Sequence, residues 1–191
     1  MYILTVKFKD DYLCFKKNDR YFFQNITLLV GEQGCGKSSL LRCLQKQEYL
    51  DVQLTDLGLK GVDTFYFDFE KDNPRVKDPR LFSNVDGTNR GIGLGNAVIS
   101  RFKSHGEILK NYSINGLRKA KDCVIFFDEP ESSLSIRNQF KLIQEIEMAV
   151  KRNCQFIIAT HCFPLIESQG NVLSLEHNSW MSSKDFIETQ R

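Results

Sequence analysis

The sequence predicts an α/β fold in which a mostly parallel central sheet is covered by helices on both faces. Three observations support this prediction: short continuous apolar runs, an amphipathic helical pattern, and the alternation of the two along the chain. Such runs are typical of strands buried on both faces, and they occupy residues 26–30, 123–127, 154–159 and 172–175. A 3.6-residue apolar period follows the second run, at Ile136, Phe140, Ile143, Ile146 and Val150. Strands alternating with helices favour parallel pairing.

Other segments complete the expected architecture. The alternating residues 2–8 predict a first strand, and we expect residues 12–15 to pair with it as an antiparallel hairpin. Residues 64–69 predict a further strand, with Phe65 and Phe67 on one face and Tyr66 on the other. A small helical lobe is expected at about residues 70–120. The whole chain, residues 1–191, is predicted to form a single domain.

Composition excludes several classes of protein. The net charge of the 191 residues is only +2, which gives no global argument for nucleic acid or an anionic membrane. The N-terminal segment lacks the pattern of a signal peptide, and no apolar run approaches the roughly 20 residues that span a bilayer. We therefore expect a cytoplasmic protein without membrane insertion. The six cysteines form no metal-binding pattern; Cys35 alone is expected to be accessible and open to alkylation.

A glycine-rich loop between the first buried strand and the next helix predicts a nucleotide site. Residues 31–38 match the pattern GxxxxGK[ST], with a strand before them and an amphipathic helix after them. Backbone amides of such a loop turn toward phosphate oxygens, and the helix adds the positive end of its dipole. Lys37 would reach the outer phosphates and Ser38 would ligate Mg²⁺. The expected ATP-binding residues here are Gly31, Glu32, Gln33, Gly34, Cys35, Gly36, Lys37, Ser38 and Ser39.

Two acids end the second buried strand, which predicts the other half of the site. Asp128 and Glu129 follow four apolar residues, and a parallel sheet would place them at its carboxyl edge beside the glycine-rich loop. Asp128 would hold Mg²⁺, and Glu129 would act as the general base for an attacking water. The sequence therefore predicts an ATPase that uses ATP and Mg²⁺.

In order and spacing, these motifs resemble those of the ABC-type ATPases, closest to soluble, single-domain and SMC-like ATPases of DNA repair and prokaryotic defence. The likeness rests on the glycine-rich loop, on Ser104-His105-Gly106-Glu107, on the acidic strand end with the following residues 132–135, and on His161 after a buried strand. It implies head-to-tail homodimers with ATP between the protomers. Ser104, Gly106 and Glu107 would then contact the γ-phosphate in the partner, and residues 132–135 would cross the interface. His161 would act with Glu129 and Lys37 as the catalytic set.

The chain departs from transporter ATPases of this family at two points. Its signature segment differs, and no Gln follows the strand at residues 64–69, where Asp68 or Glu70 would have to replace it. The aromatic residue that stacks on adenine is not identified, with Tyr12, Tyr21 and Phe22 as candidates.

Several functions remain open on the sequence alone. The first hypothesis is an ATP-driven switch or motor subunit that works on a partner protein, for example a nuclease, in DNA repair or antiviral defence. A nucleotide or small-molecule kinase, with an arginine lid from Arg75, Arg80 and Arg90, and a transporter's nucleotide-binding subunit are the alternatives. Direct DNA binding is a weaker possibility, based on basic clusters at residues 7–20 and 118–121.

Overall fold

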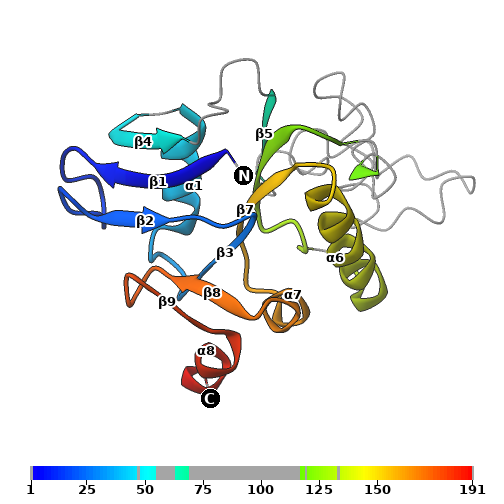
Figure 1. The fold of residues 1–191 in the computed structure, drawn as a ribbon. Coiled ribbons are helices and arrows are strands. Elements are labelled where there is room, and N and C mark those ends of the chain that lie inside the picture. Colours follow the sequence, from blue (N-terminus) through cyan, green and yellow to red (C-terminus); the bar gives the residue numbers. More distant parts are fainter. Residues whose placement is uncertain are drawn as a thin grey trace, which may run out of the picture.

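The strands that the structure describes form two sheets, which pack on either side of a helix (Figure 1). The computed structural model describes residues 2–46, 48–54, 63–68, 117–118, 120–132 and 134–190. Within them lie a three-stranded sheet in the order β2-β1-β4 and a six-stranded sheet in the order β5-β6-β7-β3-β8-β9. The expected helical lobe at about residues 70–120 falls almost wholly outside the described residues.

The six-stranded sheet is parallel except at one edge. Its strands are β3 (Ile26–Val30), β5 (Asp63–Asp68), β6 (Cys123–Asp128), β7 (Gln155–Ala159), β8 (Asn171–Ser174) and β9 (Ser179–Ser182). β5, β6, β7, β3 and β8 pair in parallel, and β9 returns antiparallel beside β8. The sequence therefore predicted the central strands within about a residue at each end, as their buried apolar runs allow.

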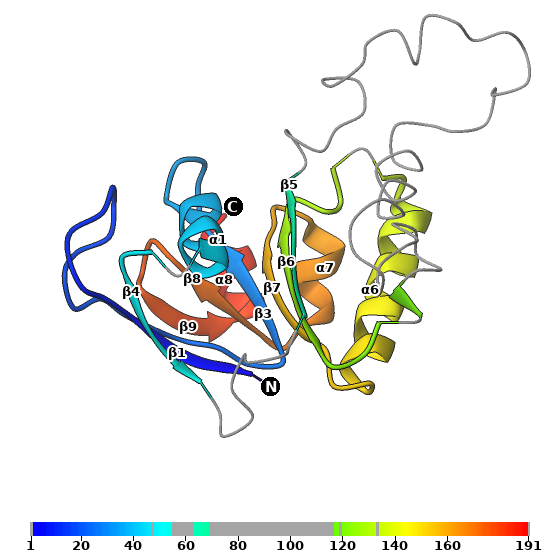
Figure 2. The same ribbon diagram turned by 90° about the horizontal axis from the view of Figure 1, so that it is seen from above.

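Helices cover both faces of this sheet, which confirms the predicted layers. Figure 2 shows α1 (Lys37–Lys46) between the two sheets, with α6 (Ile136–Val150) and α7 (Phe163–Ser168) on the opposite side of the central sheet. Successive residues of β6 point to opposite faces. Accordingly Val124 and Phe126 join the apolar cluster around α1, while Ile125 and Phe127 join the cluster under α6 and α7. A short C-terminal helix, α8 (Ser183–Thr189), follows β9.

The antiparallel sheet differs from the predicted hairpin. Strand β1 (Ile3–Phe8) pairs with β2 (Arg20–Phe22) on one side and with β4 (Leu50–Leu54) on the other. Tyr12 and Phe15 instead bond to each other through a small closed turn, so the expected pairing of residues 12–15 with the first strand is wrong. The reason lies in packing: Phe15 folds back to stack on Phe8, with ring centroids 4.5 Å apart, and this contact stabilises the closed turn.

Helix α6 forms as predicted but buries a different face. Ile136 and Phe140 are 67% and 53% exposed, although the apolar period placed them in the core. They belong to the first turns of α6, which follow directly on the loop at the carboxyl edge of the sheet. Burial begins only later in the helix, at Leu142, Ile143, Glu145, Ile146 and Ala149. Among the described residues, no helix has the length and apolar character that crossing a bilayer requires.

Candidate functional site

The glycine-rich loop between β3 and α1 is shaped by three glycines with positive φ. Gly31, Gly34 and Gly36 have φ of 138°, 88° and 102°, values that L side chains rarely adopt. A Cβ on Gly36 would lie 2.3 Å from Cys14 Sγ and 2.8 Å from Phe15 Cζ. The turn at residues 12–15 therefore lies directly against the loop, which leaves no room for a side chain there.

Lys37 is held at the centre of this loop. It is only 6% exposed, and its ammonium donates to the carbonyl oxygens of Gly31 and Glu32, each at 2.8 Å. The same ammonium lies 3.7 Å from Cys35 Sγ. The loop therefore places one buried positive charge among backbone groups that can face an anion, and the helix behind it adds its positive end.

A direct hydrogen bond between side chains joins the loop to the acidic end of β6. Ser38 Oγ donates to Asp128 Oδ1 at 2.8 Å, and Tyr66 Oη donates to Asp128 Oδ2 at 3.2 Å. A hydroxyl and a carboxylate side by side are the hard oxygen donors that Mg²⁺ prefers, and a Mg²⁺ site needs few protein ligands when phosphate supplies the rest. The residues present thus fit a magnesium ion held by Ser38 and Asp128.

Glu129 occupies a strained position immediately after β6. Its φ is 51°, which is uncommon for a residue with a side chain. The backbone N–H of Glu129 donates to the carbonyl oxygen of Ala159 at 2.9 Å, and Ser132 Oγ donates to its Oε2 at 3.1 Å. These bonds hold the turn at the sheet edge and fix the carboxylate of Glu129 beside Ser132.

His161 follows β7 at the same edge of the sheet. Partial burial, and then the nearby positive charge of Lys37, lower the pKa of its imidazole. The neutral form is therefore favoured near pH 7, so the ring can accept or donate a hydrogen bond. Its backbone N–H donates to Glu131 Oε1 at 2.9 Å.

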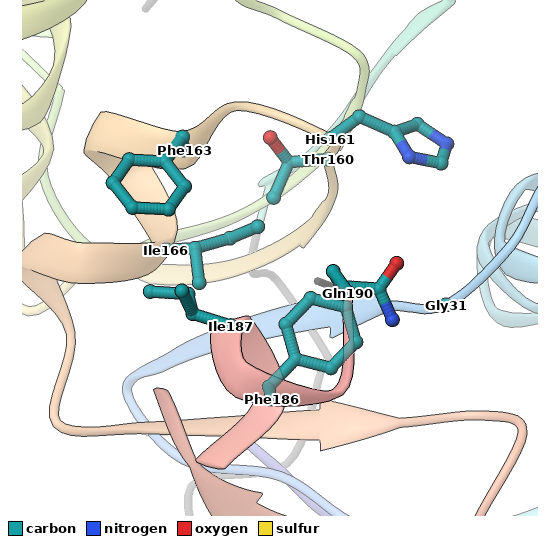
Figure 3. A pocket seen from close by; sticks show the side chains of 8 residues that line it. All are labelled: Gly31, Thr160, His161, Phe163, Ile166, Phe186, Ile187 and Gln190. Atoms are coloured by element: carbon teal, nitrogen blue, oxygen red, sulfur yellow. The ribbon is translucent and has the colours of Figure 1, made fainter. Parts of the chain in front are cut away.

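A pocket of about 200 Å³ lies beside this edge (Figure 3). Its apolar wall comes from Phe163 and Ile166 of α7 and from Phe186 and Ile187 of α8. Gly31, Thr160, His161 and Gln190 complete the lining. The imidazole of His161 points away from the four apolar side chains, toward the side of the glycine-rich loop. The pocket thus lies between the apolar side chains of α7 and α8 and the residues Gly31 and His161 of the site.

The structure brings together only part of the set that the sequence proposed. At one edge of the sheet lie five of the proposed residues: Lys37, Ser38, Asp128, Glu129 and His161. The signature residues Ser104, Gly106 and Glu107, and also Glu70, fall outside the described residues. For Asp68, only the backbone at the end of β5 is described.

The three candidates for adenine stacking differ in their surroundings. Tyr21 is 3% exposed within the core, and Tyr12 stacks on Tyr49 with ring centroids 4.3 Å apart. Phe22 is 59% exposed.

Sequence reasoning missed three residues that contact this site. Tyr66 bonds Asp128, Glu131 bonds the backbone of His161, and a carboxylate oxygen of Glu176 accepts the backbone N–H of Glu32 in the glycine-rich loop. Tyr66 could have been found from the alternation in β5. It lies on the opposite face from Phe65 and Phe67, which is the face that Asp128 shares on the neighbouring strand β6. Glu176 gives no local signal, since it reaches the loop only through the pairing of β3 with β8.

Fold and site together define a P-loop nucleoside triphosphatase with an ABC-ATPase-like fold. Residues 27–171 match the family model described as "ATPase family associated with various cellular activities (AAA)". The chain belongs to this AAA ATPase family. It is therefore an ATP-hydrolysing P-loop enzyme that uses ATP with Mg²⁺.

Solved structures support the same fold at low sequence identity. The chain is similar to cbiO1 from Clostridium perfringens, part of the ABC transporter complex cbiONQ, with a TM-score of 0.56, 15% identity, and coverage of 100% of this chain and 92% of that chain. It is similar to the dimeric ATP-binding cassette MJ0796 bound to ADP and Pi, with a TM-score of 0.51, 14% identity, and coverage of 95% and 98%.

A bacterial Atm1-family ABC exporter with ATP bound also matches, with a TM-score of 0.55, 15% identity and coverage of 100% of this chain. The chain spans 41% of the exporter chain. The resemblance to ABC-type ATPases is confirmed at the level of the fold, while the link to DNA repair and defence stays a prediction.

Proposed function

We propose that the chain hydrolyses Mg-ATP at the edge of the sheet where β3, β6 and β7 end, with Glu129 as the general base. The observation that carries this proposal is the 2.8 Å hydrogen bond between Ser38 and Asp128. It brings the glycine-rich loop and the acidic strand end within the reach of one metal ion. If the glycine-rich loop and the acidic strand end were unrelated surface motifs, this contact between Ser38 and Asp128 would not be expected.

Each residue then has one role. Backbone amides of residues 31–38 and the ammonium of Lys37 bind the outer phosphates. Bound Mg²⁺, held by Ser38 and Asp128, would neutralise charge on the phosphates. Glu129 orients the attacking water and accepts its proton, and neutral His161 donates a hydrogen bond to a γ-phosphate oxygen.

The same proposal includes ATP-dependent assembly of two protomers head to tail. Ser104, Gly106 and Glu107 would complete the partner's site, and the cycle of assembly and release would act on a separate protein partner, such as a nuclease, in DNA repair or antiviral defence in the cytoplasm. The assembly of two protomers is supported by the similarity to two dimeric structures of the cassette MJ0796. Direct DNA binding has weaker support, because acids pair three of the exposed N-terminal lysines, in Lys9–Asp51, Lys16–Asp11 and Lys17–Asp10.

The test is phosphate release by wild type and Glu129→Gln, with molecular mass followed by light scattering in Mg-ATP. We expect the variant to lose about 10²- to 10⁴-fold in turnover while it still binds ATP and accumulates as a dimer. Glu147→Gln, which changes an exposed carboxylate on α6, is the matched control and should behave as wild type. Equal turnover in wild type and Glu129→Gln would refute the role of Glu129, and a Glu129→Gln protein that stays monomeric in saturating Mg-ATP would refute ATP-driven assembly.

A second candidate is the nucleotide-binding subunit of a membrane transporter. It is favoured by the similarity to transporter cassettes over nearly the whole length of both chains. Co-purification with a membrane permease whose transport depends on Glu129 would support it. ATP hydrolysis that responds only to a protein without membrane segments would favour the first proposal.

A further inference from the structure

Glu131 is a buried acid that the proposed function does not use. It lies in the tight turn after β6, two residues beyond Glu129, and is 8% exposed. Its Oε1 accepts two hydrogen bonds, from Thr160 Oγ1 at 2.6 Å and from the backbone N–H of His161 at 2.9 Å. Among the residues that the structure describes, its Oε2 has no hydrogen-bond partner although it is buried.

We propose that Glu131 is a positioning residue for ATP hydrolysis, which fixes the backbone of His161 relative to Glu129. This inference rests on the proposed roles of Glu129 and His161. It concerns the geometry between them and assigns no contact between Glu131 and ATP.

The hydrogen bonds around Glu131 form one continuous chain across the sheet edge. Thr160 Oγ1 donates to Glu131 and accepts the backbone N–H of Cys162 at 2.9 Å, so three consecutive residues after β7 are bound to one carboxylate directly or through one hydroxyl. Together these bonds leave the segment that carries the imidazole little freedom to shift as long as Glu131 stays in place.

The same turn also holds the carboxylate of Glu129. Ser132 donates to Glu129 twice, through its backbone N–H to the carbonyl oxygen at 3.1 Å and through Oγ to Oε2 at 3.1 Å. Glu131 lies between these two residues. A movement of the turn would therefore change the position of Glu129 and of His161 together, which makes the turn a mechanical link between the proposed base and the proposed γ-phosphate contact.

The choice of an acid at this position favours a role in activity over a role in stability. Burial raises the pKa of Glu131, because the charged form loses its hydration there, and the nearby charge of Glu129 acts in the same direction. A buried carboxylate with one unpaired oxygen is unfavourable compared with an apolar side chain of similar shape. Its two short bonds to the residues after β7 are what an apolar side chain could not supply.

The experiment compares Glu131→Leu with Glu131→Gln, whose amide oxygen can still accept both hydrogen bonds. We expect Glu131→Leu to lower kcat about 10- to 100-fold with little change in KM for ATP, as misplacement of a catalytic group does, and Glu131→Gln to retain most of the turnover. Glu147→Leu, on the exposed face of α6, is the control for a change from acid to leucine. If Glu131→Leu does not fold, Thr160→Val is the second variant: it keeps the shape, removes the hydrogen bond to Glu131 and the one from the N–H of Cys162, and should also lower kcat.

A double-mutant cycle separates positioning from general damage. In a His161→Ala background, Glu131→Leu should lower kcat much less than it does in wild type, because the imidazole whose backbone it positions is gone. A full additional loss in that background, or a rise in KM in place of a fall in kcat, would overturn the proposal.

A measurement without nucleotide keeps the test independent of the proposed function. Hydrogen exchange at the backbone amide of His161 should be faster in Glu131→Leu than in wild type and should stay slow in Glu131→Gln. If wild type released no phosphate, the proposed function would fail, while this exchange would still report whether Glu131 holds the segment. Unchanged exchange in Glu131→Leu would overturn the inference on its own.

Discussion

The glycine-rich loop and the acidic turn face each other across the site, but they are held in different ways. The loop satisfies its lysine from within, since Lys37 donates to carbonyl oxygens of its own loop. The acidic turn is held from outside, because Glu129 bonds the end of β7 through its backbone and Glu131 bonds the residues that follow β7. The lysine of the loop is thus held within its own segment, whereas the acidic turn bridges two neighbouring strands.

This difference separates two kinds of sensitivity. Changes in the glycine-rich loop should alter the surface that binds phosphate, so they should change the affinity for ATP and the free energy of unfolding. Changes in the bridging turn should leave that surface intact and should appear in turnover.

The largest effect should come from a bulky group added to the loop at Cys35. Of the six cysteines, Cys43, Cys123, Cys154 and Cys162 are buried, which leaves Cys14 and Cys35 open to a maleimide. Because Cys35 Sγ lies 3.7 Å from Lys37 Nζ, an adduct there would fill the phosphate-binding loop, and N-ethylmaleimide should abolish ATP binding in wild type.

Variants identify the thiol responsible. Treated Cys14→Ser protein should lose ATP binding as wild type does, whereas the double variant Cys14→Ser/Cys35→Ser should bind ATP equally before and after treatment. ATP added first should slow the labelling of Cys35. Loss of binding in the treated double variant would show that another thiol is responsible.

Next in size is the effect of a methyl group on the glycines of the loop. Gly36→Ala should lower the free energy of unfolding by about 1–3 kcal/mol through backbone strain. Overpacking against Cys14 and Phe15 should lower it by about 1–3 kcal/mol more. Gly34→Ala is the matched control, because its φ of 88° is also positive but nothing lies within 4 Å of the added Cβ. Urea unfolding of both variants measures the difference, and equal losses would mean that the turn at residues 12–15 yields freely.

In the acidic turn we expect a smaller effect on stability, and here a glycine should be favourable. Because Glu129 has a φ of 51°, Glu129→Gly should be more stable than Glu129→Ala by about 1 kcal/mol, while both lack turnover. Thermal unfolding of the two proteins gives the comparison. A less stable glycine variant would indicate that the turn relaxes when the side chain is removed.

The smallest effect concerns the pH dependence of stability at Glu131. Its pKa is raised above the ordinary value by burial, so the stability that its protonated form contributes is complete below the unfolded-state pKa and is lost as pH rises through the folded-state pKa. Glu131→Gln cannot ionise. The melting temperature of Glu131→Gln should therefore increase relative to that of wild type as pH rises from about 4 to about 7. Glu147→Gln should show no such trend. If the melting temperature of Glu131→Gln instead increased relative to wild type as pH falls, the raised pKa of Glu131 would be contradicted.

The parts of the fold that the sequence predicted are those whose pattern is set by local burial. The strands at residues 26–30 and 123–127 are continuous apolar runs, and the structure buries them on both faces. Ile136 and Phe140 were misplaced because periodicity shows which residues share a helix face and does not show where the neighbouring layer begins. The small turn at residues 12–15 depends on a contact of Phe15 with Phe8, which no local pattern specifies.

The candidate site divides along the same line. Lys37, Ser38, Asp128 and Glu129 belong to motifs whose spacing carries their chemistry, so the sequence could propose them together. Glu131 also stands in the sequence beside them, but its bonds to Thr160 and His161 depend on β6 lying next to β7. Its burial was therefore visible only in three dimensions.

The buried amide of Gln155 makes the first strand depend on a residue that is synthesised late. Its Oε1 accepts the backbone N–H groups of Tyr2 and Ile3, and its Nε2 donates to the carbonyl oxygens of Ile3 and Gln24. Strand β3 lies between β7 and β8, both of which come late in the sequence. A ribosome must therefore release most of the chain before Gln155 can bind the backbone of Tyr2 and Ile3 and before β3, which leads into the phosphate loop, gains its neighbours. Until then, the apolar strands β3 and β6 are open to chaperones and to aggregation, and ATP has no finished site to bind.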